Sequence, residues 1–283
     1  MNILTTLLLT LVNLMVKKLF VERIYKKIYI DPHNIYVRIH AKNYSFWYRS
    51  VAYDDLNMMC RENLKFWESS SREIFSELAK KSNFVLDIGS FTGIYTLIAS
   101  KSNKNVHTIS FEPNPLIFRA LEKNLRLNRI KNAKLEKLAL DNESGRDFLH
   151  LNHEVYMSAA SIIETNLNYE KYEVEKSTLD SYFEKNETLT VDLMKIDVEG
   201  LETRILEGSR KVLSKFSPIL LMEALTKEAK DSQLSFLKNL NYLEPLQVKG
   251  DGYDSNNWLW FTEKDLNRIK ELRQYLIFSD NSF

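Results

Sequence analysis

The sequence predicts an α/β fold in which helices alternate with the strands of an open, mostly parallel sheet. A buried strand, a turn with two glycines and the start of a helix follow one another in Phe84–Ala99. Further strand-like runs then alternate with helical ones, and several of these strands end in carboxylates. Near the C-terminus, Tyr242–Val248 and Asn257–Thr262 read as two strands joined only by a loop, so they must pair antiparallel.

The composition is that of an ordinary globular protein. Of 283 residues, 44% are hydrophobic and 27% are charged, and the chain has 39 basic and 38 acidic residues. The net charge of +1 gives no electrostatic reason to expect a nucleic acid as the partner. The single cysteine, Cys60, excludes an intramolecular disulfide and a cysteine-based zinc site, which agrees with a reducing, cytoplasmic location.

The chain begins with a nearly uncharged run, Ile3–Val16, followed by Lys17 and Lys18. The run is shorter than the roughly 20 residues that a membrane-spanning helix needs, and no basic residue precedes it as in a secretory signal. Three interpretations stay open: a helix that packs on the protein, an anchor on a membrane surface, and a span extended past the lysines. We expect an N-terminal helical and aromatic extension over 1–65 and the α/β domain over 66–283.

Three features near the predicted domain carry alternatives of their own. The aromatic segment Ser45–Tyr53 is either a packing cap or a lid over a substrate pocket. Glu68, at the start of a predicted helix, either faces that pocket or is a solvated helix-start carboxylate. Leu151–Glu175 is a long polar stretch without clear periodicity, and we expect a loop that helps to line the pocket.

The turn after the strand Phe84–Ile88 is the first predicted ligand site. Glycine accepts a positive φ and lets another group approach the backbone closely, and ligands of open α/β sheets bind at the carboxyl ends of strands. The predicted cofactor-binding residues of this turn are Asp87, Gly89, Ser90 and Gly93.

Two more carboxylates follow later strands. Glu112 comes about 20 residues after the glycine turn, where an acidic residue holds the two hydroxyls of a nucleotide's ribose. The alternative for Glu112 is an exposed loop residue. Asp141, after the strand-like run Ala133–Ala139, either meets the adenine amino group or is a simple turn residue.

A second turn rich in carboxylates contains Asp197 and Glu199, and Glu223 ends the following strand. Charges of this kind are costly in a core unless they are paired. If the strands are parallel, these three carboxylates lie at the same edge of the sheet as Asp87 and Glu112.

Five segments in this order resemble the FkbM-type methyltransferases: VLDIGSFTGIYTLIAS, ISFEPNPLIFRALEKNLRLN, TLDSYF, VDLMKIDVEGLETRILEG and PILLMEA. The resemblance covers roughly residues 66–262, and its most specific parts are FEPNP and KIDVEG. It implies a class I, Rossmann-like fold with a seven-stranded, mostly parallel sheet, an antiparallel last strand and helices on both faces. It also implies S-adenosylmethionine as the cofactor.

The resemblance carries roles onto individual residues. Asp87, Gly89 and Gly93 match the family's cofactor turn. Glu112 matches the acidic residue that holds the ribose, and Asn114 lies in the same turn.

The resemblance also places Asp197 and Glu199 beside the transferred methyl group. A hydroxyl acceptor must lose its proton around the transition state, and a carboxylate with a raised pKa can take it. Asp197 is the first candidate for this catalytic base, and Glu199 or Glu223 is the second. Two alternatives stay open: these carboxylates hold a divalent metal, or Asp197 merely pairs with Lys195 or a backbone amide.

The sequence therefore predicts an enzyme that uses S-adenosylmethionine to methylate a hydroxyl of a small molecule, sugar or glycan. No metal and no nucleic acid belong to this prediction, and any membrane-surface contact would run through Ile3–Val16. One alternative is a nucleotide-binding module without catalysis. Another is an NAD-type oxidoreductase, which is disfavoured because the turn lacks the GxGxxG pattern.

Overall fold

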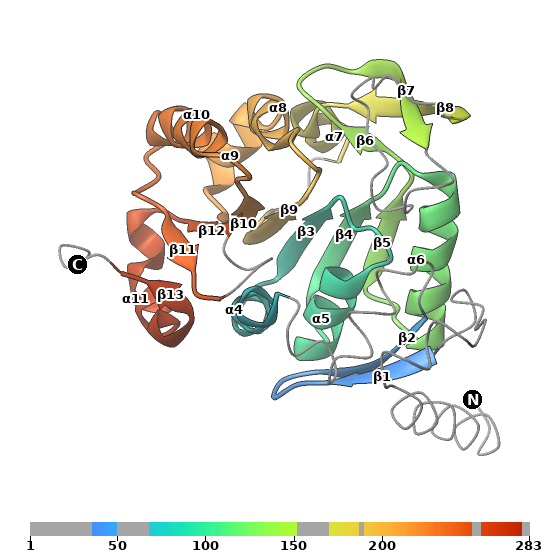
Figure 1. Cartoon of the computed structure of the whole chain (residues 1–283), viewed down its shortest axis with the longest axis horizontal. Helices are drawn as coiled ribbons and strands as arrows, with labels where there is room; N and C mark the ends of the chain where they lie inside the picture. The colour runs from blue at the N-terminus through green and yellow to red at the C-terminus, as the bar shows by residue number, and fades with distance from the viewer. Residues whose placement is uncertain (1–35, 50–67, 152–169, 187–189, 251–255, 279–283) are drawn as a thin grey trace, which may run out of the picture.

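A computed structural model describes residues 36–49, 68–151, 170–186, 190–250 and 256–278. Its centre is an eight-stranded sheet (Figure 1). In spatial order the strands are β13 (Leu276–Ile277), β11 (Leu246–Val248), β12 (Asn257–Trp260), β10 (Ile219–Glu223), β9 (Leu193–Ile196), β3 (Phe84–Ile88), β4 (His107–Phe111) and β5 (Ala133–Glu136).

The strand directions confirm the predicted fold class. β10, β9, β3, β4 and β5 pair in parallel. β12 pairs antiparallel with both β10 and β11, so it is the reversed strand of the predicted C-terminal hairpin. The two-residue strand β13 adds an eighth member at the edge beside β11, which the sequence did not indicate.

Helices cover both faces of this sheet, as predicted (Figure 1). Side chains from α4, α5, α6 and α11 pack on one face, and side chains from α7, α8, α9 and α10 pack on the other. The alternation of buried residues along β3 divides the core in the same way, since Val85 belongs to the first cluster and Leu86 to the second. The helices are α4 (Ser69–Ala79), α5 (Ile94–Ser102), α6 (Pro115–Leu127), α7 (Leu179–Glu184), α8 (Glu202–Glu207), α9 (Arg210–Phe216), α10 (Lys227–Lys238) and α11 (Leu266–Lys270).

Two small sheets flank the main one. β1 (Tyr36–His40) and β2 (Ser45–Arg49) form an antiparallel hairpin whose β2 contacts α5 and α6. The aromatic side chains Phe46, Trp47 and Tyr48 are buried there, so the described part of the aromatic segment is a packing cap.

The other small sheet has the order β6 (Ala139–Leu140), β8 (Glu170–Ser177), β7 (Gly145–Leu151). The prediction of a loop through Glu175 is therefore wrong from Glu170 onward, because Arg146–Leu151 and Glu170–Glu175 pair along their whole length. Alternating charged side chains had hidden this strand from the sequence. The expectations for Ile3–Val16 and for 152–169 lie outside the described residues. Of the helices in the part of the chain that the structure describes, none is both long and apolar enough to cross a membrane.

Alanine substitutions at three glycines should distinguish the cost of a strained backbone from the cost of a steric clash. The loss of unfolding free energy should rise in the order Gly200, Gly208, Gly89. At Gly208, with an ordinary φ of −74°, a Cβ would lie 2.0 Å from the carbonyl oxygen of Asp141. Gly200 has φ +100° but nothing within 4 Å, whereas Gly89 combines φ +76° with a Cβ position 1.8 Å from the carbonyl oxygen of Asp197. We expect Gly200→Ala to cost about 1 kcal/mol of unfolding free energy, Gly208→Ala about 2, and Gly89→Ala more than about 3.

Denaturant unfolding of the three variants measures these differences. A loss at Gly89→Ala no larger than that at Gly200→Ala would contradict the close approach of the Gly89 turn to Asp197.

Candidate functional site

The candidate site lies at the carboxyl edge of the main sheet, where the strand order changes direction. From β3 the chain continues through β4 to β5 on one side, and the later strands β9 and β10 lie on the other side. The turns after β3 and β9 therefore flank a topological switch point, where open α/β sheets form a ligand crevice. Because these strands are parallel, the predicted strand-end carboxylates share this edge.

The glycines of the first turn allow neighbouring segments to approach it. Gly89 packs against the backbone of Asp197, and Asp197 N–H donates to the carbonyl oxygen of Ile88 at 3.0 Å. At Gly93 a Cβ would lie 2.4 Å from Leu121 Cδ1 of α6. Because these two residues have no side chain, the two turns can contact each other and α5 can pack against α6. Direct contact of either glycine with the cofactor stays a prediction.

Ser90 stabilises the same turn from within. Its hydroxyl donates to the carbonyl oxygen of Asp87 at 2.7 Å, and the N–H groups of Gly89 and Ser90 both donate to the carbonyl oxygen of Phe111. These contacts tie the turn after β3 to the end of β4. The predicted contact between Ser90 and a cofactor stays a prediction.

Glu112 is a buried carboxylate held in a fixed orientation. Its Oε2 accepts from Phe91 N–H at 3.0 Å, and its Oε1 accepts from Asn114 N–H at 2.8 Å. Burial raises its pKa to about 8, although both backbone donors act in the opposite direction. The alternative of an exposed loop residue is therefore wrong, since Glu112 is 7% exposed.

Asn114 supplies an unused donor beside Glu112. Its side-chain oxygen caps α6 by accepting from the N–H groups of Leu116 and Ile117, and Pro115 occupies the first helical position. The amide Nδ2 is buried and has no hydrogen-bond partner among the described residues. A buried donor without a partner costs free energy, so a ligand that accepts from it fits this place.

Asp87 is buried under α5. Its Oδ2 accepts from the Thr96 hydroxyl at 2.5 Å, and that hydroxyl also contacts Ser110 Oγ at 2.6 Å. Burial raises the pKa of Asp87 to about 6, while the Thr96 hydrogen bond acts against this shift. These contacts join β3, β4 and α5, and the role of Asp87 toward a cofactor stays a prediction.

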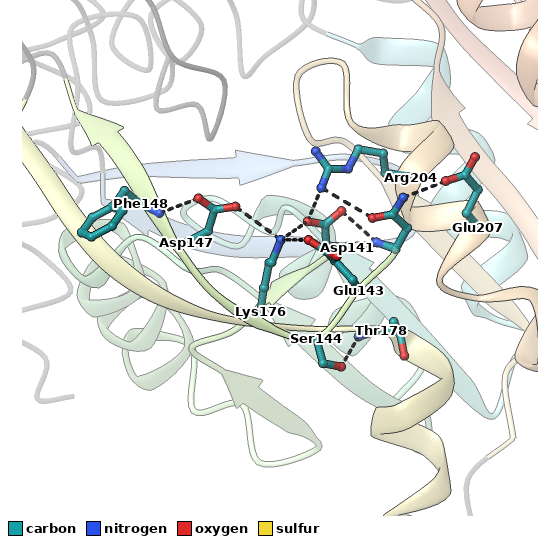
Figure 2. Close-up of polar contacts among 10 residues, drawn as sticks. Asp141, Glu143, Ser144, Asp147, Phe148, Lys176, Thr178, Arg204 and Glu207 are labelled. Carbon is teal, nitrogen blue, oxygen red and sulfur yellow. Dashed lines mark hydrogen bonds and ion pairs between the residues drawn. The ribbon is translucent and has the colours of Figure 1, made fainter.

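Asp141 is the centre of an ion-pair cluster (Figure 2). Its Oδ2 lies 2.7 Å from Arg204 of α8 and 3.2 Å from Lys176 of β8, and its Oδ1 accepts from Asn142 N–H at 2.7 Å. The carboxylate is 2% exposed. It therefore links the small sheet to α8, and its predicted contact with adenine would have to be made alongside these partners.

The second turn is charge-compensated by Lys195. Lys195 is 1% exposed, and its Nζ lies 2.9 Å from Asp197 Oδ2. Burial alone would lower the pKa of Lys195, but Asp197 and Glu68 outweigh it and raise the pKa. Asp197 therefore pairs with Lys195, and its role as the catalytic base stays a prediction.

Glu68 belongs to this same buried cluster. Tyr95 donates to Glu68 Oε2 at 2.7 Å, and Asn257 Nδ2 donates to Glu68 Oε1 at 3.0 Å. Burial raises the pKa of Glu68, against the opposing effect of Lys195. The interpretation of Glu68 as a solvated carboxylate is wrong, because it is 6% exposed. Sequence reasoning missed Tyr95 and Asn257, since nothing local distinguishes them from core residues.

Glu199 and Glu223 complete the acidic rim of the site. Glu199 has φ +55° and lies at the exposed end of the turn, where partial desolvation and then the charge of Asp197 raise its pKa to about 6. The same two causes raise the pKa of Glu223 to about 8. Glu202 fixes the turn, since its Oε1 accepts from the N–H groups of Val198 and Gly200.

Among the described residues, no cluster of three or more His, Cys, Asp or Glu side chains has the arrangement needed to hold a metal ion. The described part of the site holds carboxyl groups with raised pKa values around one buried cation, Lys195.

The family of the chain follows from a comparison with family models. The model described as Methyltransferase FkbM domain matches residues 87–276. The chain therefore belongs to the FkbM methyltransferases, as the five segments indicated. This membership also confirms S-adenosylmethionine as the cofactor. No curated protein matches the chain.

Several solved structures are similar. The methyltransferase FkbM from Methylobacillus flagellatus KT has a TM-score of 0.46 and 14% identity, over 73% of this chain and 52% of that one. The chain thus spans about half the length of that protein. M. jannaschii TYW2 in complex with AdoMet has a TM-score of 0.41 and 12% identity, over 80% and 83%. Precorrin-6y C5,15-methyltransferase from Geobacter metallireducens GS-15 has a TM-score of 0.40 and 16% identity, over 68% and 85%.

The buried cation predicts a large effect of its removal. In Lys195→Met the carboxylates of Asp197 and Glu68 lose their compensating charge, and we expect a loss of about 3–5 kcal/mol of unfolding free energy. The matched control is Lys134→Met, which removes a half-exposed ion pair with Glu136 and should cost less than about 1 kcal/mol. Equal losses in urea unfolding would contradict a structural role for the buried pair.

Proposed function

We propose that the chain transfers a methyl group from S-adenosylmethionine to a hydroxyl of a small molecule, sugar or glycan. The observation that carries this proposal is a pair of carboxyl groups with raised pKa values at one sheet edge, the buried Glu112 and the half-buried Glu223. Glu112 stands beside an unpaired amide donor on one side of the switch point. Glu223, with a pKa raised to about 8, stands on the other.

The first group of residues fits the cofactor. The carboxylate of Glu112 is clamped by two backbone donors and keeps lone pairs that can accept from two ribose hydroxyls. Asn114 Nδ2 has a free proton to donate at the same place. We assign cofactor binding to Glu112 and Asn114 directly, and we assign the shaping of the turn to Gly89, Ser90 and Gly93.

The second group of residues fits the acceptor. S-adenosylmethionine supplies an electrophilic methyl group on a sulfonium. This chain must position the acceptor hydroxyl in line with it, exclude water and take the hydroxyl proton. Glu223 is the stronger base, because its pKa is raised to about 8; the carboxyl is mostly protonated at pH 7, and the ionised form that takes the proton grows as the pH rises toward 8 and above. Asp197, which pairs with Lys195, serves to hold the charge of the turn, and Glu199 is the second candidate base.

Cofactor binding should release a proton from Glu112. At pH 7 this carboxyl is mostly protonated, since its pKa is about 8. Ribose hydroxyls that donate to it favour the ionised form, so S-adenosylhomocysteine should displace the proton. Calorimetry in two buffers of different ionisation enthalpy should show this release. Glu112→Gln should show none and should bind about tenfold weaker or more.

The control is Glu122→Gln, which changes a charge on α6 paired with Arg126. It should keep wild-type affinity and proton release. Absence of any heat from wild type with S-adenosylhomocysteine would overturn the proposed function. Binding without a proton difference between wild type and Glu112→Gln would overturn the assignment of Glu112.

Glu223 should make stability depend on pH between its usual pKa of about 4.5 and its folded pKa of about 8. The folded carboxyl keeps its proton over this interval, whereas the unfolded one ionises near 4.5. The stability from Glu223 is therefore present below pH 4.5 and is lost as the pH rises toward 8. Glu223→Gln stays neutral, so its thermal midpoint should gain on wild type from pH 5 to pH 8.

The same variant should also lose methyl transfer while it keeps S-adenosylhomocysteine binding. Glu228→Gln, an exposed substitution in the first turn of α10, is the control for both measurements. A constant difference in thermal midpoint at all pH values would contradict the raised pKa of Glu223.

The acceptor is found by a screen with methyl-labelled cofactor against soluble, envelope and RNA fractions. Label in a sugar, glycan or small-molecule fraction supports the proposed acceptor class. Label in RNA would overturn that class and leave methyl transfer itself intact. Binding of the cofactor without label in any fraction supports the alternative of a non-catalytic module.

A further inference from the structure

A hollow lies at the edge of the main sheet opposite the candidate site, at the amino ends of β3, β4 and β5. Its volume is about 640 Å³. It is lined by the first residues of these strands, the end of α5 and the loop between α6 and β5. The length of the parallel strands separates it from the site of Glu112 and Glu223. We call it the amino-edge pocket.

The lining of the amino-edge pocket is strongly basic. The described lining residues include no carboxylate. The basic ones are Lys101, Lys104, His107, Arg129, Lys131 and Lys134. In a chain with a net charge of only +1, this is a local concentration of positive charge.

Most of these cations have no acidic partner within the described residues. Lys134 lies 2.7 Å from Glu136, and Lys101 donates to the carbonyl oxygen of Asn128 at 2.9 Å. Neither Lys104 nor Lys131 forms an ion pair with a described residue. Burial lowers the pKa of Lys101, and the neighbouring charge of Lys104 lowers it further. Crowded cations of this kind are relieved by an anion.

Two buried hydroxyls in the lining have no partner. Ser100 is 4% exposed and Thr108 is 1% exposed, and both Oγ atoms lack a hydrogen bond to any described residue. Thr96 precedes Ser100 by one turn of α5, and Ser110 follows Thr108 by two residues of β4, so each lies on the same face as that neighbour. The Thr96 hydroxyl forms hydrogen bonds with both Ser110 and Asp87. The hydroxyls of Thr96 and Ser110 are thus satisfied within the protein. Those of Ser100 and Thr108 leave a hydrogen bond for a ligand of the amino-edge pocket.

The remaining lining is apolar. Phe84, Ile109, Ile130 and Ala133 contribute to it, and the Phe84 ring stacks on His107 with centroids 5.1 Å apart. An ion alone would leave this surface uncovered. A ligand that joins an anionic head to an apolar body would cover both parts.

We infer that the amino-edge pocket binds a phosphate monoester attached to an apolar group. Several cations around two hydroxyl donors match the charge and the three acceptor oxygens of a phosphate. The apolar lining takes the group that carries it. Such a ligand comes from two sources, a soluble organic phosphate or the headgroup of a phospholipid.

Phenyl phosphate and inorganic phosphate are the soluble probes, with affinity measured by calorimetry on the full chain. Phenyl phosphate should bind about tenfold tighter than inorganic phosphate, because only its ring covers the apolar lining. Lys104→Gln with Lys131→Gln should weaken phenyl phosphate binding by about tenfold or more. Lys123→Gln with Arg126→Gln removes the same charge from α6 outside the pocket and should leave the affinity within about twofold.

Thr108→Val tests the unpartnered hydroxyl. The variant removes a buried donor that has no partner, so it should raise the thermal midpoint of the ligand-free protein. It should also weaken phenyl phosphate binding about fivefold or more. Unchanged binding of S-adenosylhomocysteine in all these variants shows that the fold and the opposite edge are intact.

Vesicles of phosphatidylcholine with and without phosphatidic acid separate the two sources. Binding only with phosphatidic acid, displaced by phenyl phosphate, identifies a lipid headgroup. Binding of phenyl phosphate without binding to vesicles identifies a soluble ligand. Either result supports the pocket. Equal losses in the pocket variant and the α6 control, unchanged affinity in Thr108→Val, or no binding of either probe would overturn it.

Discussion

The candidate site depends on one backbone contact, the approach of Gly89 to the carbonyl group of Asp197. A side chain at Gly89 would place its Cβ 1.8 Å from that oxygen, so the two turns meet only because this residue has none. The hydrogen bond from Asp197 N–H to Ile88 reinforces the same junction. The turns after β3 and β9 come from segments far apart in the sequence. Their contact brings Glu112 and the acidic rim to one edge of the main sheet.

This edge places several carboxyl groups together, and Lys195 compensates part of their charge. Burying its ammonium would be costly by itself. The carboxylates of Asp197 and Glu68 outweigh that cost, and Tyr95 and Asn257 satisfy the remaining oxygens of Glu68. Lys195 also lowers the pKa values of Glu223 and Glu199, but desolvation and the charge of Asp197 outweigh it and raise them to about 8 and about 6. Carboxyl groups whose environments push their pKa values apart are the arrangement that general acid–base chemistry uses.

The sequence was informative wherever a pattern was local. Strand β3, its glycine turn and the terminal hairpin follow from residues within a few positions of one another, and so does the placement of Glu112 at the end of β4. Contacts between residues far apart in the sequence have no such local pattern. Nothing near Glu68 announces Asn257, and nothing near Asp141 announces Arg204 of α8. The burial of Glu68 and the ion pairs of Asp141 therefore became visible only when distant elements were packed together.

The net charge of +1 said least about the ligands, because it sums the charges of two unlike edges of the main sheet. The carboxyl edge gathers Asp87, Glu112, Asp197 and Glu223, and the amino edge gathers cations around the hollow at β3–β5. The near-zero total conceals both. Carboxyl groups accept hydrogen bonds from hydroxyls and, once ionised, attract a cationic ligand such as a sulfonium, whereas clustered cations attract an anion. Since parallel strands carry the two edges apart, the same sheet can present opposite fields to two ligands without either neutralising the other.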